Sequence, residues 1–210
     1  MTIRRSREQS KRRNLEHIKQ MAKQLFEQKG YEATTTREIA EAAEIATGTL
    51  FLYVKDKAEL LILIYTDALE EITANSFATL TEDMPFLDAL MHIFGPCLRF
   101  YEQHLENARH FLKELLFHSG GNDGHQLSAT QKEGIIERLV DLVRHAQERG
   151  EIRQQLDPQL AARSFFAMYF AAVIAWLGNI LLSDADVLAG ADIQDQLRAV
   201  FDLQIRGMLP

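Results

Sequence analysis

The sequence IATGTLFLYVKDKAELL, residues 45–61, joins a short helical turn to the start of a longer helix. Small residues at 47–49 precede an apolar and aromatic run, and Lys-Asp-Lys at 55–57 separates that run from the next helix. On a helix, Leu50 and Val54 lie one turn apart and share a face, so we expect them to pack inward. A glycine near the start removes a side chain where the backbone approaches another molecule. The stretch therefore predicts a short helix that is anchored by one face and exposed on the others.

The outward faces of this helix carry hydroxyl groups. Thr49 and Tyr53 form one i, i+4 pair, and Thr47 forms another with Phe51. Hydroxyls donate hydrogen bonds to phosphate oxygens and base edges, and Lys57 adds a cation at the N-terminus of the next helix, which itself attracts phosphate. A short helix with small residues first and a tyrosine last fits the major groove of DNA. The alternative is an ordinary helical hairpin without a nucleic-acid ligand.

Two further helices are expected before this stretch. Apolar residues at helical spacing predict a helix over residues 14–29, and Gly30 stands where a C′ glycine ends a helix. Thr35 and Glu38 form a T-x-x-E capping box, which predicts the start of a second helix. A third helix, residues 47–54, follows after a gap of about three to four residues, which is the helix-turn-helix arrangement.

The rest of the chain also predicts helices. Asp56 and Glu59 form a second capping box at the start of a long helix, which we expect to connect two domains. Further helices are expected at 86–103, 105–118, 128–149, 158–182 and 192–207. Their expected N-caps are Ser128, Asp157 and Asp192. Residues 120–124, GGNDG, are expected to form a loop. No run of alternating polarity predicts a strand.

We therefore predict an all-α protein with two domains. Residues 1–57 are expected to form a basic arm and a three-helix helix-turn-helix domain, and residues 58–210 a larger helical domain. The composition agrees, since 47% of the residues are hydrophobic and 25% charged, with only 11 Gly and 4 Pro. The single Cys97 excludes an internal disulfide and a multi-cysteine zinc site, and favours a reducing cytoplasm. No apolar segment follows Arg13, so a secretory signal is not expected.

The charge is distributed unevenly along the chain. Residues 1–57 hold 12 Lys/Arg and 8 Asp/Glu, a net +4, whereas residues 58–210 hold 11 and 22, a net −11. A basic N-terminal part on an acidic body predicts a polyanion partner at one end only. We expect residues 4–13 to form a flexible basic arm that adds salt-dependent affinity for DNA and can enter the minor groove. A solvated tail without a partner is the alternative.

Residues 30–61, GYEATTTREIAEAAEIATGTLFLYVKDKAELL, resemble the start of the TetR family of bacterial transcriptional regulators. The family's pattern has Gly-Tyr/Phe, Thr-Thr, Ile-Ala, Gly-Thr-Leu, a later aromatic residue and a Lys before Leu-Leu. This chain supplies Gly30-Tyr31, Thr34-Thr35, Ile39-Ala40, Gly48-Thr49-Leu50, Tyr53 and Lys57. A weaker similarity occurs at residues 149–166, where the sequence resembles the family's entry into its penultimate helix.

The chain departs from the family pattern in and after the turn. Glu44 replaces the usual turn glycine, so this residue either adopts a left-handed backbone or alters the turn. Ala46 replaces the usual serine cap, so Thr47 is a candidate cap instead. Phe51 lacks the hydroxyl of the family's tyrosine, and Leu52 replaces a commonly polar residue; both can contact thymine methyl groups.

The resemblance implies roles for individual residues. Those expected to face base edges are Arg37, Thr47, Gly48, Thr49 and Phe51, with Leu52 beside them. Those expected to hold phosphates are Thr35, Thr36, Tyr53 and Lys57. For Arg37 the alternative is a solvated helix residue, and for Lys57 it is a charge that only caps the helix.

The longest apolar segment is FFAMYFAAVIAWLGNILL, residues 165–182. Its length meets the lower limit for a membrane span, but the charged flanks and the amphipathic helix that follows favour burial within protein. The resemblance implies that the last two helices form the interface of a homodimer, which places two recognition helices on a pseudo-palindromic DNA site. It also implies a small-molecule effector, for which the candidate contacts are Tyr101, His104, Tyr169 and Asn179.

Other functions receive less support from the sequence. His110, Glu114 and His118 recur at every fourth position, but the outer two lie about two turns apart, so a solvated stripe is favoured over a metal site. A helical-bundle carboxylate enzyme needs Glu-x-x-His pairs, and this sequence has none. We therefore predict a non-enzyme without cofactor or metal: a cytoplasmic, homodimeric DNA-binding regulator, released from its operator by an effector. A helical interaction module without DNA binding is the alternative.

Overall fold

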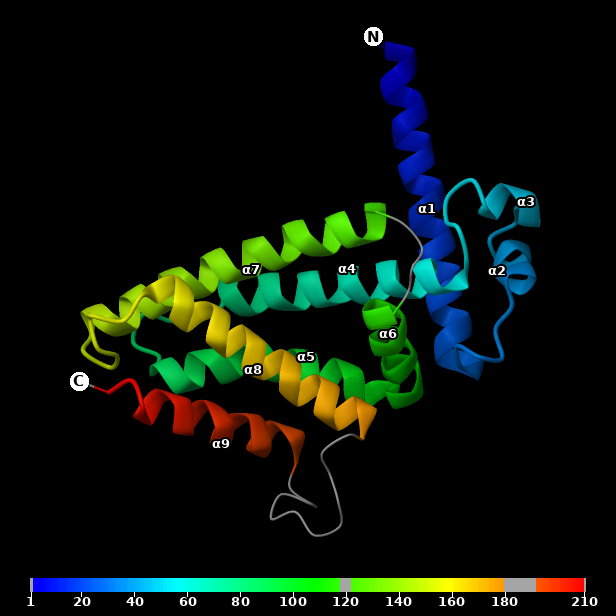
Figure 1. The fold of residues 1–210 in the computed structure, drawn as a ribbon. Coiled ribbons are helices and arrows are strands. Elements are labelled where there is room, and N and C mark those ends of the chain that lie inside the picture. Colours follow the sequence, from blue (N-terminus) through cyan, green and yellow to red (C-terminus); the bar gives the residue numbers. More distant parts are fainter. Residues whose placement is uncertain (1, 118–121, 180–191, 210) are drawn as a thin grey trace. The chain divides into compact units, whose positions relative to one another are not determined.

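The computed structural model describes residues 2–117, 122–179 and 192–209, and the described residues form helices and no strand (Figure 1). The helices are α1 (Thr2–Lys29), α2 (Thr36–Ala42), α3 (Thr47–Leu50), α4 (Lys57–Ala78), α5 (Phe86–Gln103), α6 (Leu105–Phe117), α7 (Asn122–Glu148), α8 (Pro158–Gly178) and α9 (Ile193–Arg206). The predicted all-α class, with an N-terminal helix-turn-helix and a helical C-terminal part, is confirmed.

The chain divides into two compact units. The first contains residues 1–68 and 104–125, and the second contains residues 69–103 and 126–210. Helices α4 and α7 each cross from one unit to the other, and α6 belongs to the first unit although α5 belongs to the second. This division describes packing; the functional division after residue 57 stays a prediction.

The capping box at the start of α2 is present. The Thr35 Oγ1 accepts a hydrogen bond from the backbone N–H of Glu38 (3.2 Å), and the Glu38 carboxylate accepts from the backbone N–H of Thr35 (2.8 Å). Lys29 at the end of α1 also donates to the Glu38 carboxylate. These hydrogen bonds, that from Lys29 first, lower the pKa of Glu38 to about 2, so the box stays ionised until strongly acidic pH.

The turn between α2 and α3 has the left-handed residue that the sequence made possible. Glu44 has φ 55°, one of two described non-glycine residues with positive φ. Its neighbour Ile45 donates a backbone hydrogen bond to Ala40 O (2.9 Å), which closes the turn. Ala46 occupies the N-cap of α3 without a side-chain hydrogen bond, so the suggestion that Thr47 caps this helix is wrong. The Thr47 hydroxyl therefore does not cap α3.

The third helix is shorter than we predicted. α3 ends at Leu50, and the chain continues to residue 53 in turns rather than in an α-helix. After Leu50, Leu52 N–H donates to Thr49 O (3.1 Å) and Tyr53 N–H to Leu50 O (2.9 Å), and one i→i+4 bond follows from Val54 N–H to Leu50 O (3.2 Å). Such i→i+3 bonds tighten the last turn and end a helix.

The first helix is longer than we predicted. α1 begins at Thr2, so the basic residues 4–13 continue the helix and do not form a flexible arm (Figure 1). Residues 2–29 contain neither Gly nor Pro and are rich in Arg, Lys, Glu and Gln, which are good helix formers. The prediction failed because it treated a charged segment without apolar periodicity as unstructured.

The caps of the other helices are partly as predicted. Asp56 accepts from the backbone N–H of Glu59 (2.8 Å) at the start of α4, and the Glu59 carboxylate accepts from the backbone N–H of Lys55 (2.5 Å). Asp157 and Asp192 cap α8 and α9. Ser128 is not a cap, because α7 already begins at Asn122, within the predicted loop. Residues 118 and 180–182 of the predicted helices lie outside the described residues, as do residues 120–121 of the predicted loop.

The core of the second unit is aromatic. Phe201 of α9 is fully buried and packs edge-on against Phe165 of α8, with ring centroids 5.7 Å apart. Phe94 of α5 lies 5.8 Å from Phe201 and stacks on Tyr169 at 4.4 Å. Rings from three helices therefore fill the space where α5, α8 and α9 meet.

Helix α8 is apolar on nearly all sides. By length and composition alone it is the one helix of the described residues that could cross a membrane, and a third of its apolar window is buried in this chain. A core helix of a soluble protein passes the same test. Much of the apolar surface of α8 is therefore left uncovered by this chain.

Candidate nucleic-acid interface

The reading segment, residues 47–54, has one buried and one exposed side. Leu50 and Val54 are buried, as predicted, and they anchor the segment in the first unit. Phe51 and Leu52 between them are 47% and 74% exposed. The segment therefore presents aromatic and aliphatic side chains to solvent from a rigidly held backbone.

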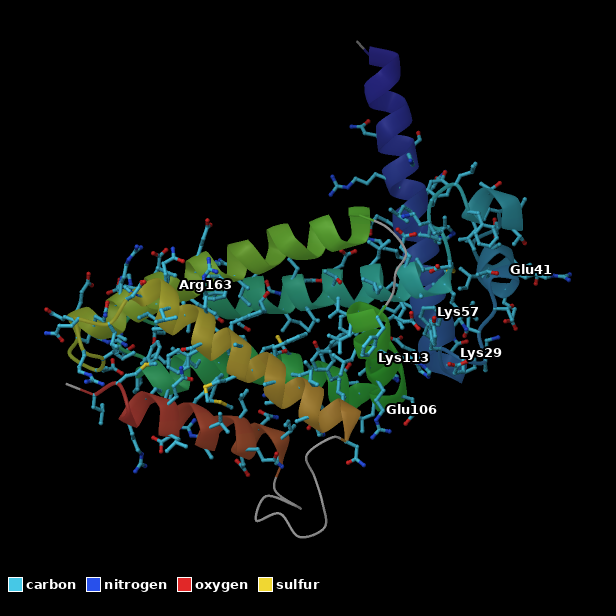
Figure 2. The ribbon with its side chains drawn as sticks, in the orientation of Figure 1. Lys29, Glu41, Lys57, Glu106, Lys113 and Arg163 are labelled. Carbon is cyan, nitrogen blue, oxygen red and sulfur yellow. The ribbon has the colours of Figure 1, made fainter. Side chains whose placement is uncertain are left out.

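The predicted base-facing residues occupy the outer side of α2 and α3. Gly48 is exposed, and a Cβ added there would meet nothing within 4 Å. Thr47 and Thr49 are half-buried on the same turn. Arg37 of α2 is exposed, and its Nε donates to the carboxylate of Glu41 (2.8 Å), one turn along the helix; Figure 2 shows Glu41 on α2. Arg37 is thus accessible to solvent. To reach a base, its guanidinium must either break the ion pair with Glu41 or contact Glu41 and the base together.

The residues predicted to hold phosphates differ in whether their polar groups already form hydrogen bonds within the protein. The Thr35 hydroxyl serves the capping box of α2, and Thr36 is half-buried. Tyr53 accepts a hydrogen bond from the Asn14 Nδ2 of α1 (2.9 Å), which orients the phenol and leaves its own proton to donate. Tyr53 is therefore held beside α1 with a donor available.

Lys57 forms its hydrogen bonds within its own unit. Its ammonium donates to the backbone carbonyls of Tyr31 (2.8 Å) and Thr34 (2.9 Å), and more weakly to that of Glu32 (3.4 Å). It also lies over the Tyr31 ring, 4.2 Å from the centroid. The side chain, labelled in Figure 2 where α4 begins, points into its own unit rather than toward solvent.

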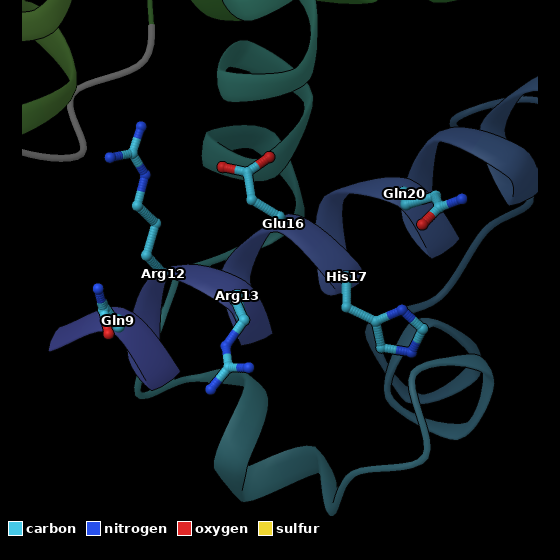
Figure 3. Close-up of a pocket in the computed structure, with 6 residues that line it drawn as sticks. All are labelled: Gln9, Arg12, Arg13, Glu16, His17 and Gln20. Carbon is cyan, nitrogen blue, oxygen red and sulfur yellow. The ribbon is translucent and has the colours of Figure 1, made fainter. Parts of the chain in front are cut away.

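The exposed side of α1 adds positive charge next to the reading segment. Figure 3 shows polar side chains along consecutive turns of this one helix: Gln9, Arg12, Arg13, Glu16, His17 and Gln20. Because all of them come from a single helix, they line an open surface and not an enclosed cavity. The hydrogen bond between Asn14 and Tyr53 places this basic stretch of helix directly beside the reading segment.

Comparison with known proteins identifies this arrangement. Residues 18–64 match the model of the bacterial regulatory proteins of the tetR family. A probable HTH-type transcriptional regulator of Pseudomonas putida, ArpR, is 27% identical over 198 residues, which is 90% of each chain. The uncharacterized HTH-type transcriptional regulator YhgD of Bacillus subtilis is 24% identical over 173 residues, 82% of this chain and 89% of YhgD.

Over residues 18–64, the chain carries the DNA-binding head of the TetR family. It is accordingly a DNA-binding transcriptional regulator, and the resemblance noted in residues 30–61 is confirmed.

Solved structures share the fold over nearly the whole chain. A TetR-family repressor of Thermus thermophilus, FadR, crystallised with lauroyl-CoA, superposes with a TM-score of 0.69 at 22% identity and covers 93% of this chain and 95% of its own. A Bacillus subtilis FadR with stearoyl-CoA has a TM-score of 0.66 at 20% identity, with coverage of 91% and 98%. At this identity the likeness establishes the fold.

The residues predicted to contact the effector do not all come together in the structure. Tyr101 of α5 and Tyr169 of α8 are buried and hydrogen-bonded to each other, with Cys97 also hydrogen-bonded to Tyr169. Burial raises the pKa of Tyr169 well above its usual value and that of the Cys97 thiol to about 12. Asn179 is exposed and ends α8 in a left-handed conformation (φ 52°). His104 belongs to the other unit.

The stripe of α6 that could suggest a metal site is partly packed against the protein, in contrast to the solvated stripe that the sequence favours. His110 packs against the Tyr31 ring (centroids 4.9 Å apart), and its Nδ1 lies 3.4 Å from the Glu32 carboxylate. His118 lies outside the described residues. Among the residues that the structure describes, no group of three His, Cys, Asp or Glu side chains is placed to hold a metal ion.

The sequence analysis missed Asn107. This residue of α6 is 4% exposed, its Oδ1 accepts from the backbone N–H of Tyr31 (2.8 Å), and its Nδ2 donates to Phe26 O (2.7 Å). A signal was available, because Asn107 stands four residues before Phe111 on the apolar face of the predicted helix. A polar residue on a buried face requires hydrogen-bond partners.

Proposed function

We propose that the chain is a homodimeric repressor that binds a pseudo-palindromic operator and is released by an apolar small molecule. The observation that carries the proposal is the exposed reading segment of a TetR-family head, with Gly48, Phe51 and Leu52 uncovered over a buried Leu50. Its DNA-facing residues are those predicted from the sequence except Lys57, whose ammonium donates to backbone carbonyls of its own unit. As a bacterial DNA-binding regulator, it is proposed to act in the cytoplasm.

The proposed contacts divide into base readers and phosphate binders. Gly48 and its threonine neighbours allow close approach to the base edges, and Phe51 and Leu52 offer apolar surface to thymine methyl groups. Thr35, Thr36 and Tyr53 lie at the edges of this surface and supply hydroxyls to phosphates. Because residues 4–13 belong to a helix, and an α-helix of 10–12 Å diameter does not enter a minor groove about 6 Å wide, we propose that they contact phosphates only.

The proposed dimer is formed by α8 and α9. Leu160 of α8 is 68% exposed, and Leu203 of α9 is 72% exposed. Together with the uncovered part of the apolar α8, these side chains form the kind of surface that a second copy covers. Two-fold symmetry then presents two reading segments to successive major grooves, about 34 Å apart.

Replacing Leu203 with aspartate is expected to dissociate the dimer without unfolding the protomer. The side chain is exposed, so the charge costs little in the separated chain, but it would be buried against the partner copy. Light scattering after size-exclusion chromatography measures the mass. The matched control is Leu52→Asp, which alters a leucine of similar exposure in the reading segment and should leave the dimer intact. A Leu203→Asp chain that remains dimeric would exclude this interface.

The proposed effector is an acyl-CoA or a similar molecule with a long apolar chain, because two solved structures of this fold are complexes with lauroyl-CoA and stearoyl-CoA. The hydrogen-bonded pair Tyr101 and Tyr169 supplies polar groups among the buried apolar rings of the second unit. A ligand site needs a few such groups in apolar walls. His104 and Asn179 are weaker candidates, because His104 belongs to the other unit and Asn179 is exposed at the end of α8.

The function is tested with DNA from upstream of the protein's own gene. Full-length protein is expected to retard this DNA, with an affinity that falls steeply as salt rises, since each phosphate contact contributes about −0.9 to the slope of log K against log salt. Deleting residues 1–13, which carry six cations and one acid, should flatten this slope. Lauroyl-CoA and stearoyl-CoA should then reduce the bound fraction at constant salt.

Two outcomes would point elsewhere. Retardation of all sequences alike, with no preference for the upstream DNA, would contradict a sequence-specific regulator. A complete lack of DNA binding would favour the alternative function, a helical interaction module. If DNA binds specifically but neither acyl-CoA releases it, only the proposed effector class fails.

A further inference from the structure

The corner between α1 and α2, residues 30–34, is held by two helices that are distant in sequence. Gly30 begins the corner with φ 86°, a conformation that favours glycine, and its N–H donates to Phe26 O (3.0 Å). Thr34 ends it and is buried, with its hydroxyl donating to Gly30 O (2.8 Å). Thr35, the N-cap of α2, follows at once. The conformation of the corner therefore determines where α2 begins.

Lys57 of α4 holds the corner from one side. Its three carbonyl partners match the three N–H donors of an ammonium group, and the Tyr31 ring takes the cation on its face. A lysine at the first position of a helix opposes the helix dipole, so these contacts must offset an unfavourable placement. To bind a phosphate, the Lys57 ammonium would first have to break its hydrogen bonds to the backbone carbonyls of the corner.

Asn107 of α6 holds the corner from the other side. Both polar atoms of its side-chain amide form hydrogen bonds. The Oδ1 accepts from the N–H of Tyr31, and the Nδ2 donates to Phe26 O in the last turn of α1. His110, one turn further along α6, packs on the same Tyr31 ring. Desolvation in this setting raises the pKa of Tyr31 to about 12.

We propose that Lys57 and Asn107 are positioning residues that lock this corner, and that Lys57 is not a phosphate ligand in this protein. The lock fixes the start of α2, and α3 follows α2 through the closed turn at Glu44, so the lock orients the reading segment relative to α1. The inference rests on the proposed function where it concerns DNA. It departs from the role that the TetR resemblance implied for Lys57.

Two substitutions of Lys57 separate a lock from a phosphate ligand. Lys57→Arg keeps the charge but replaces the compact ammonium with a planar fork that cannot reproduce three convergent bonds, and Lys57→Met keeps the stem without the charge. A lock predicts that both variants melt at lower temperature and bind the operator at least tenfold more weakly, with an unchanged salt slope. The control Arg12→Met, on the exposed side of α1, should lower the slope and leave the melting temperature unchanged.

A phosphate ligand predicts the reverse. In that case Lys57→Arg would bind nearly as well as the wild type, and Lys57→Met would melt normally while the slope falls by about 0.9 per protomer. This result would overturn the proposal.

The Asn107 side of the lock is tested by hydrogen exchange in the full chain, without DNA. The Tyr31 amide is bonded to the Asn107 Oδ1, 76 residues away. Asn107→Ala is expected to speed exchange of this amide at least tenfold, whereas Asn107→Asp retains an acceptor and should keep much of the protection. Equal protection in Asn107→Ala and wild type would overturn the proposal. Because the exchange and melting measurements need no DNA, they test the lock even if the proposed function fails.

Discussion

Replacing Gly48 with alanine is expected to stabilise the free protein and, at the same time, to weaken its binding to the operator. A Cβ at this position meets nothing within 4 Å, and alanine is favoured over glycine in a helix by about 0.5–1 kcal/mol. In the complex, however, the new methyl group would stand where the backbone of α3 approaches the base edges. We expect an affinity loss of about tenfold for alanine, which corresponds to about 1.4 kcal/mol, and a larger loss for Gly48→Glu.

Operator titration and thermal melting of the same samples measure the two effects. The matched control is Gly134→Ala in α7, where a Cβ also meets nothing within 4 Å. It should raise the melting temperature by a similar amount and leave operator affinity unchanged. If Gly48→Ala binds DNA as tightly as the wild type, Gly48 does not face the groove, and the proposed reading segment is wrong.

Replacing Phe201 with alanine is expected to cause the largest loss of stability. The side chain is fully buried between Phe165 and Phe94, so its removal leaves a cavity where α5, α8 and α9 meet. Such substitutions cost about 3–5 kcal/mol, which for a chain of this length corresponds to a fall in melting temperature of roughly 10 °C.

Denaturant unfolding at one fixed protein concentration measures this loss, because dimerisation makes apparent stability concentration-dependent. The matched control is Phe51→Ala, which removes the same side chain from a position that is 47% exposed. It should change the free energy of unfolding by about 0.5 kcal/mol or less, and instead weaken operator binding. Similar losses for both variants would show that the aromatic cluster is not the core of the second unit.

Local sequence signals predicted those features whose causes are local. The capping box of Thr35 and Glu38 and the caps of α8 and α9 involve residues two or three apart, so the spacing alone specifies them. The burial of Leu50 and the exposure of Phe51 follow from helical periodicity in the same way. The left-handed Glu44 was one of two alternatives, and the structure selected it.

The extent of the helices was predicted less well. α1 continues through residues 2–13 because intrinsic helix propensity extends it beyond the apolar stripe that the prediction relied on. α3 stops at Leu50, and residues 51–53 continue in turns with mainly i→i+3 backbone bonds, which no side-chain pattern indicated. Apolar periodicity predicts which face of a helix is buried. The ends of a helix can be predicted from the sequence only where a capping residue is present.

By itself, the sequence determined the helical class, the helix-turn-helix and the family, because these depend on short-range periodicity, caps and a contiguous motif. Only the tertiary structure decided what Lys57 and Asn107 contact. Their partners at the corner lie 23 to 81 residues away along the chain. A lysine before a helix looks the same in sequence whether it faces a phosphate or a backbone carbonyl. The difference lies in which carbonyl groups the fold brings within hydrogen-bonding distance, and that is a property of packing.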